Sequence, residues 1–134
     1  MIRTGDPEAD VAAVRTVARN YLDGMVYADE KKLRSAFHPS AAVVGHGPGG
    51  LEWDSVDSFV AAVLRDGGPP AGTSYFAEII SVDITGDLAV VKLTDDYLGA
   101  RYTDYLTMLW HEERWTIIHK AFHQHGVDRR SVGA

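Results

Sequence analysis

Apolar residues recur at helical spacing near the N-terminus of the chain. Asp6 and Pro7 are residue types preferred at a helix cap and in a first helical turn. The apolar positions that follow lie three or four residues apart, which predicts an amphipathic helix packed against a core. They are Val11, Val14, Ala18, Tyr21, Leu22 and Met25. Two shorter helices are predicted next, one from Asp29 to just before Pro39 and one from about residue 54 or 55 to 65.

The C-terminal half alternates apolar and polar residues with a period of two, which is typical of β-strands. Four such segments cover residues 75–84, 88–98, 101–110 and 114–125, and a shorter strand is predicted over 41–46. Because the connections between the four are very short, they predict antiparallel hairpins. Helices followed by a meander predict an α+β fold in one domain over 1–134, with 126–134 as a frayed tail.

The hairpin turns assign side chains to the two faces of this sheet. If the dipeptides GA and EE are two-residue turns, Asp95 faces Asp104 and Leu106 faces His119. Asp104 then lies diagonally next to His119 and His123 on an otherwise apolar face. An acid and two imidazoles on that face predict a pocket.

The opposite face of the sheet mixes large residues with threonine and lysine. It is predicted to carry Lys92, Thr94, Thr103, Tyr105, Thr107, Ile118, Lys120 and Phe122. Such a broad, partly apolar face favours contact with another protein surface over bare solvent. Because twofold dimers are the commonest oligomers, we expect a homodimer through the sheet.

Composition narrows the classes of partner. The 134 residues carry a net charge of -6, and nucleic acids and anionic membranes select basic surfaces, so neither is expected as a partner. The chain has no cysteine, so thiolate chemistry is excluded. The first residues lack the apolar run of a signal peptide, and no later stretch could span a bilayer, so a cytoplasmic location is expected.

Four segments resemble one known family: YLDGMVYADEKKLRSAFHPSAAVVG, SVDITGDLAVVKL, YTDYLTMLW and RWTIIHKAFH. Together, from Tyr21 to His123, they resemble the putative lumazine-binding family. This family belongs to the nuclear-transport-factor-2-like superfamily, which also holds ketosteroid isomerases, limonene epoxide hydrolases and polyketide cyclases. The resemblance implies a cone-shaped, barrel-like fold, with three N-terminal helices packed on a strongly curved, mainly antiparallel sheet around a pocket. That fold hosts enzymes, binding proteins and inert modules.

Ketosteroid isomerases use a carboxylate base on the first strand, with a Tyr and a protonated Asp as an oxyanion hole. By resemblance, Tyr21 falls at the position of that Tyr, and Asp104 within about one residue of that Asp. The position of the base falls on Gly45. His46 is adjacent, but on a strand its side chain points to the opposite face. The isomerase reaction itself is therefore not expected unless a bulge turns His46 inward.

The predicted catalytic residues are Asp104, His119 and Tyr21. An acid in an apolar pocket has a raised pKa, and an adjacent imidazole could move the proton while Tyr21 donates to an oxyanion. Asp95 opposite Asp104 could share a proton with it, or lie at the solvated end of its strand. For each of these side chains the structural alternative is a satisfied hydrogen bond in the core.

Further residues are predicted to bind a ligand along the wall and rim of the pocket. They are Met25, His38, Trp53, Phe59, Phe76, Asp95, Leu106 and His123. For His38 the alternative is a structural role at the helix end. Histidines four residues apart on one strand are about 13 Å apart, so a metal site is not predicted. No cofactor is predicted either.

Three functions are compatible with these residues. The first is a small-molecule-binding dimer of unassigned activity, with an apolar pocket for a small apolar or planar organic ligand. The second is a general acid/base enzyme, such as an isomerase, cyclase or hydrolase, acting in that pocket. The third is a non-catalytic interaction module with a filled core. A filled core would not need Asp104 inside it, which favours the first two.

Overall fold

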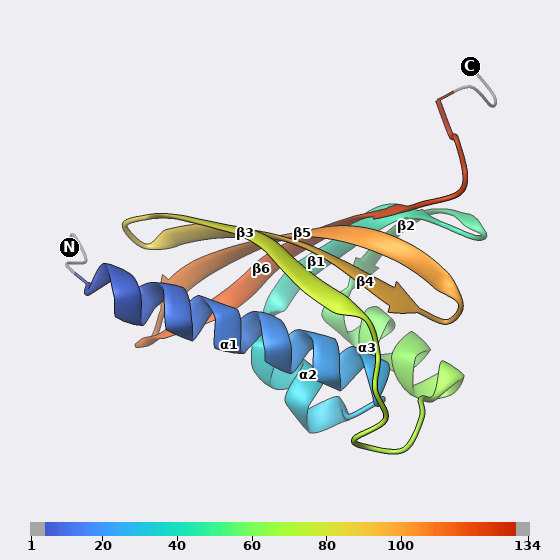
Figure 1. The fold of residues 1–134 in the computed structure, drawn as a ribbon, viewed down its shortest axis with the longest axis horizontal. Coiled ribbons are helices and arrows are strands. Elements are labelled where there is room, and N and C mark those ends of the chain that lie inside the picture. The colour runs from blue at the N-terminus through green and yellow to red at the C-terminus, as the bar shows by residue number, and fades with distance from the viewer. Residues whose placement is uncertain (1–4, 131–134) are drawn as a thin grey trace.

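The computed structural model describes residues 5–130, and within them three helices lie on one face of a six-stranded sheet (Figure 1). The helices are α1 (Pro7–Val26), α2 (Glu30–Ala36) and α3 (Val56–Asp66). The strands are β1 (Phe37–Gly47), β2 (Gly50–Ser55), β3 (Ala77–Thr85), β4 (Leu88–Tyr97), β5 (Ala100–His111) and β6 (Arg114–Gln124). The α+β prediction is confirmed.

Side-chain caps fix where the helices begin. The Asp6 carboxylate accepts a hydrogen bond from the backbone N–H of Glu8 at 3.0 Å, and Pro7 occupies the first helical turn. Asp29 and Ser55 cap α2 and α3 in the same way. Each cap satisfies a backbone N–H that has no partner inside the helix, so these residues select the helix start.

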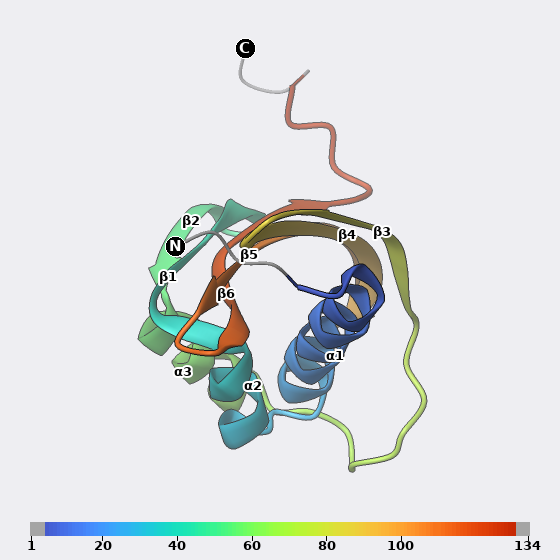
Figure 2. The ribbon, with the colours of Figure 1, turned by 90° about the vertical axis from the view of Figure 1, so that its left-hand side faces the viewer.

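Among residues 5–130 the sheet runs in the order β2-β1-β6-β5-β4-β3, and only β1 and β6 pair in parallel there. It curves around the helices, which lie on its concave side (Figure 2). The strand predicted over 41–46 begins earlier, at Phe37, and β2 was not predicted. β2 is a short strand at the edge of the sheet with a mostly exposed burial pattern, so it lacks the apolar alternation of a half-buried strand.

The predicted register between β4 and β5 is wrong by two residues. The turn consists of Leu98 and Gly99, both with positive φ (50° and 79°), rather than Gly99 and Ala100. Leu93 therefore faces Asp104, and Asp95 lies diagonally next to Asp104. A shift of two residues leaves every side chain on its predicted face, because strand side chains alternate with a period of two.

A bulge in β6 has a larger effect. The turn at Glu112 and Glu113 is as predicted, but the register shifts between Thr107 and Met108 by one residue of β6. A one-residue shift exchanges the two faces of a strand. Lys120 is therefore opposite Leu106. The predicted pairing of Leu106 with His119 is wrong.

The core lies between the concave face of the sheet and the helices. Its fully buried members include Val14, Leu22, Val60, Leu106, Met108 and Ile117. At the other end of the chain, Arg129 donates to the carbonyl oxygen of Gly47 and to Gln124 Oε1, so the tail contacts the sheet there. The rest of the predicted frayed tail, 131–134, lies outside the described residues. Within 5–130, none of the helices has both the length and the apolar character needed to cross a bilayer.

Candidate functional site

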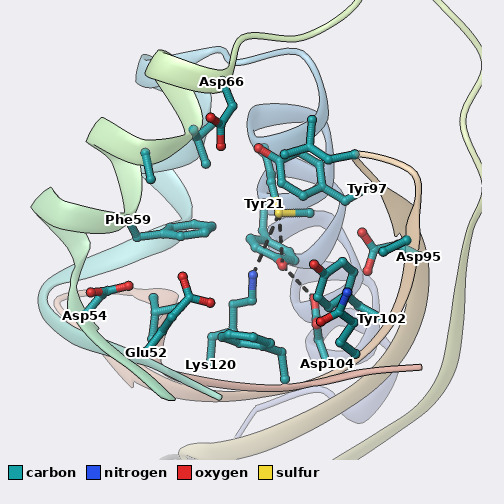
Figure 3. Close-up of a pocket in the computed structure, with 18 of the residues that line it drawn as sticks. Tyr21, Glu52, Asp54, Phe59, Asp66, Asp95, Tyr97, Tyr102, Asp104 and Lys120 are labelled. Carbon is teal, nitrogen blue, oxygen red and sulfur yellow. Dashed lines mark hydrogen bonds between the residues drawn. The ribbon is translucent and has the colours of Figure 1, made fainter. Parts of the chain in front are cut away.

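A pocket of about 250 Å³ lies between the concave face of the sheet and helices α1 and α3 (Figure 3). Its inner wall is formed by Tyr21, Met25, Phe59, Asp95, Tyr97, Tyr102, Asp104, Lys120 and Phe122. Three further carboxylates line it from β2 and the end of α3: Glu52, Asp54 and Asp66. Aromatic walls with a few converging polar groups are typical of sites for small molecules.

Two acidic side chains are buried in the wall. Asp95 is 0% exposed and Asp104 1%. The hydroxyl of Tyr21 donates a hydrogen bond to Asp104 Oδ2 at 2.6 Å. Among residues 5–130, no partner reaches the other Asp104 oxygen or either oxygen of Asp95. Because buried polar atoms normally have partners, this arrangement is typical of a functional site.

The environment of the acids changes their protonation. Burial, together with the negative charge of Asp104, raises the pKa of Asp95 to about 7, although the Lys120 ammonium offsets part of the rise. Burial also raises the pKa of Asp104, while the Lys120 ammonium and the hydrogen bond from Tyr21 lower it. The Tyr21 hydroxyl donates to Asp104 only, so the two coupled carboxyl groups lie in different environments.

Lys120 brings a positive charge into the same pocket. It is only 5% exposed, and its Nζ lies 4.4 Å from the ring centre of Phe59, 4.8 Å from that of Tyr21 and 5.4 Å from that of Phe122. Its Nζ also lies 3.8 Å from Met25 Sδ. Aromatic faces attract a cation, so these rings stabilise the ammonium inside an otherwise apolar cage.

Gly45 occupies the position where the isomerase resemblance expects a carboxylate base. A Cβ there would lie 2.5 Å from the carbonyl oxygen of Phe122 and 2.8 Å from two of its ring carbons. The absence of a side chain therefore lets the Phe122 ring pack against β1. In this chain the two buried acids of the pocket, Asp95 and Asp104, come from β4 and β5 instead.

The structure brings only some of the predicted residues together. Tyr21, Met25, Phe59, Asp95 and Asp104 line the pocket. Leu106 is fully buried in the core, on the same sheet face. Trp53 and Phe76, by contrast, are exposed by 72% and 39% and are not among the lining residues. His38 accepts a hydrogen bond from the backbone of Ser40 and lies beside His111, away from the pocket.

His119 and His123 pair with Ala42 and His46 of β1, outside the pocket lining. The predicted proximity of His119 and His123 to Asp104 is therefore wrong, and the bulge in β6 is the physical reason. Sequence reasoning missed Lys120 and Phe122, which it assigned to the opposite face. The consecutive Ile117 and Ile118, which interrupt the alternation of β6, are the signal that could have located the bulge. Within 5–130, no three His, Asp or Glu side chains are grouped as metal ligands.

The fold and this pocket define a protein of the nuclear-transport-factor-2-like superfamily. The family described as "Putative lumazine-binding" matches residues 9–123, and the chain belongs to it. A nuclear-transport-factor-2-like protein of unknown function from Silicibacter pomeroyi is 32% identical, with a TM-score of 0.84. That match covers 90% of this chain and 99% of the other. Family and neighbours together support a small-molecule-binding protein.

Two other proteins extend the comparison. A ketosteroid isomerase-like protein from Erwinia carotovora atroseptica has a TM-score of 0.69 at 16% identity, covering 88% of this chain and 98% of the other, and so shares the fold. The aldolase FrzH of a Cladobotryum species is 25% identical over 115 residues, which are 84% of this chain and 90% of that protein.

Proposed function

We propose that this chain is an enzyme that binds a small, planar, carbonyl-bearing molecule in the pocket and moves a proton on it. Asp95 and Asp104 are the acid/base pair. The observation that carries this proposal is the burial of both carboxyl groups in one pocket, with three of their four oxygens unpartnered among residues 5–130.

Such an arrangement is costly for the fold alone. A buried oxygen without a hydrogen bond costs roughly 1–3 kcal/mol. A second acid beside the first disfavours ionisation of both. Carboxyl groups that stay buried in a pocket despite this cost are candidates for catalytic residues. Burial raises the pKa of a carboxyl group, and a general acid or base needs a pKa near the working pH.

The geometry distributes the roles in the reaction. Asp95, as a carboxylate, removes a proton from the carbon next to the carbonyl group. Asp104 accepts a hydrogen bond from the Tyr21 hydroxyl. This bond offsets part of the negative charge of the pair when Asp95 is ionised. Lys120, the one cation among the described lining residues, stabilises the oxyanion that develops on the substrate.

The rim of the pocket selects the charge of the ligand. Glu52, Asp54 and Asp66 add three carboxylates to a site that already holds two acids and one lysine. A negative potential at the entrance repels anions and concentrates cations. The substrate class is therefore neutral or cationic rather than a phosphate or a carboxylate.

The comparisons support this class of chemistry. Lumazine, which names the family, is a planar bicyclic molecule with two carbonyl groups. An aldolase such as FrzH, similar to this chain over 115 residues, forms or breaks carbon–carbon bonds next to a carbonyl group. Both concern carbonyl compounds, which supports a carbonyl-bearing ligand for this pocket.

Deuterium exchange tests the proposed proton transfer. The protein is incubated with acetophenone in D2O, and incorporation of deuterium into the methyl group is followed by NMR. We expect acceleration by the wild type and a loss of about 100-fold in Asp95→Asn and Asp104→Asn. The control is Asp83→Asn, an exposed aspartate of β3.

Two results would contradict the proposal. Exchange no faster than in protein-free buffer would exclude proton transfer on this substrate class. If lumazine nevertheless bound with micromolar affinity in a fluorescence titration, a binding protein without catalysis would replace the enzyme.

We also propose that the protein is a homodimer through the convex face of the sheet. Support comes from large apolar residues that are exposed on neighbouring strands: Ile80, Leu88, Val90 and Tyr105. Exposed apolar residues gathered on one sheet face are typical of protein interfaces. Sedimentation equilibrium at micromolar concentration should give about twice the chain mass of 14.7 kDa.

A further inference from the structure

Lys120 differs from the other lysines of the chain in its position. The sequence has four lysines. Lys31 and Lys32 are exposed on α2, and Lys92 is half-buried on β4 with its Nζ 5.8 Å from the ring centre of Tyr105. Lys120 alone lines the pocket, and it points from β6 toward Tyr21 and Phe59 (Figure 3).

The contacts of Lys120 leave its nitrogen without a fixed oxygen partner. Within 5–130, its one hydrogen-bond contact is with Met25 Sδ at 3.8 Å, and three aromatic rings surround it. A structural buried lysine would normally be paired with a carboxylate. A lysine whose nitrogen has no fixed oxygen partner and opens onto a pocket can reach a carbonyl carbon bound there.

We propose that Lys120 Nζ attacks the carbonyl carbon of an aldehyde or ketone bound in the pocket and forms an imine. This covalent role replaces the oxyanion contact assigned to the Lys120 ammonium, and it rests on the proposed function of Asp95 and Asp104 as proton carriers. The pocket of about 250 Å³ and its aromatic walls fit a small aryl aldehyde or ketone.

The atoms and protons of this step balance without an oxidant or a reductant. The lysine ammonium first gives a proton to a carboxylate of the acid pair, and the free lone pair forms the N–C bond. The carbonyl π electrons move to oxygen, which takes that proton and becomes a hydroxyl. The nitrogen then loses a second proton to the pair, which returns it to the hydroxyl. Water leaves as the C=N bond forms, so ammonium and carbonyl give a protonated imine and water.

The residues around Lys120 suit these transfers. Lys120 and both acids line the same pocket, and the Tyr21 side chain connects the two parts of the site. Its ring faces the lysine, while its hydroxyl donates to Asp104. The resulting iminium withdraws electrons from the adjacent carbon, so removal of a proton by Asp95 becomes easier than from the free ketone.

Reductive trapping tests the imine directly. The intact protein is incubated with benzaldehyde and sodium cyanoborohydride, and peptide mapping by mass spectrometry locates the benzylated lysine. We expect Lys120 to be labelled at least about tenfold faster than Lys92, and acetophenone to slow the labelling by competition. Lys120→Arg should lose the fast adduct, whereas Lys92→Arg should keep it.

Lys120→Met provides a second variant of similar length in case the larger guanidinium disturbs the core. Both variants should lose the acetophenone exchange while keeping a cooperative thermal transition. Labelling of Lys120 no faster than of Lys92 would overturn the imine. If exchange in the wild type were still accelerated and sensitive to Asp95→Asn, the proposed function would stand without it. Fast labelling of Lys120 without any exchange would keep the imine and overturn the proton transfer.

Discussion

The replacement Asp95→Asn should remove a large part of the pH dependence of stability. Asp95 is fully buried, and its pKa rises from 3.8 to about 7 on folding. Well below pH 3.8 the Asp95 carboxyl group is neutral in both the folded and the unfolded state, so its burial as a neutral group costs the fold no ionisation free energy. As the pH rises toward 7, the unfolded chain releases the proton and the folded chain keeps it, so stability falls.

The magnitude follows from these two pKa values. The full difference corresponds to about 4 kcal/mol, at about 1.4 kcal/mol per pH unit. Between pH 5 and pH 8 the wild type should lose roughly 2–3 kcal/mol of its unfolding free energy through this group. The asparagine does not titrate, so Asp95→Asn should lack that loss and be more stable relative to the wild type at pH 8 than at pH 5.

Urea unfolding followed by circular dichroism at pH 5 and pH 8 measures this difference. Comparing the pH dependence of the two proteins cancels the effect of the amide on packing. Asp83→Asn should retain the wild-type pH dependence. If the pH dependence of Asp95→Asn equalled that of the wild type within about 0.5 kcal/mol, the buried acid would not have the raised pKa assigned to it.

Three other replacements test separate parts of the structure. Gly45→Ala forces a Cβ against Phe122 and should lower the unfolding free energy, measured in urea, by roughly 1–3 kcal/mol. Gly49→Ala, whose Cβ would meet nothing within 4 Å, should leave it unchanged, and equal effects of the two replacements would contradict the packing of Phe122 against Gly45. Tyr21→Phe removes the donor to a buried carboxylate and should cost roughly 1–3 kcal/mol in thermal unfolding; an unchanged melting temperature would exclude that bond. Tyr105→Glu should convert a sedimenting dimer to a monomer while Tyr105→Phe does not, and a dimer in both would exclude this interface.

Much of the fold could be predicted from the sequence, because the signals are local. Apolar spacing and capping residues such as Asp29 and Ser55 located the helices, and short polar turns located the hairpins. The strand register depended on less regular features. Leu98 adopts a positive φ of 50°, which residues other than glycine rarely do. The position of the turn therefore could not be predicted from residue type.

The candidate site depended on a single bulge. Asp104 and Tyr21 were predicted as catalytic residues, and the structure joins them by a hydrogen bond. The partner of the acids was predicted to be His119, but the extra residue in β6 places Lys120 on the pocket face instead. Strict alternation assigns side chains to faces only in a continuous ladder, and here the one sequence signal of the bulge is the pair Ile117 and Ile118.

The pH profile of acetophenone deuteration tests the central claim most directly. If the Asp95 carboxylate is the base, the exchange rate of the wild type should rise with pH, with a midpoint near its pKa of about 7, and then level off. In Asp95→Asn the accelerated component should be absent at every pH, and Asp83→Asn should reproduce the wild-type profile. Accelerated exchange in Asp95→Asn with the same midpoint as in the wild type would contradict the assignment of the buried acid pair as the proton-transfer site.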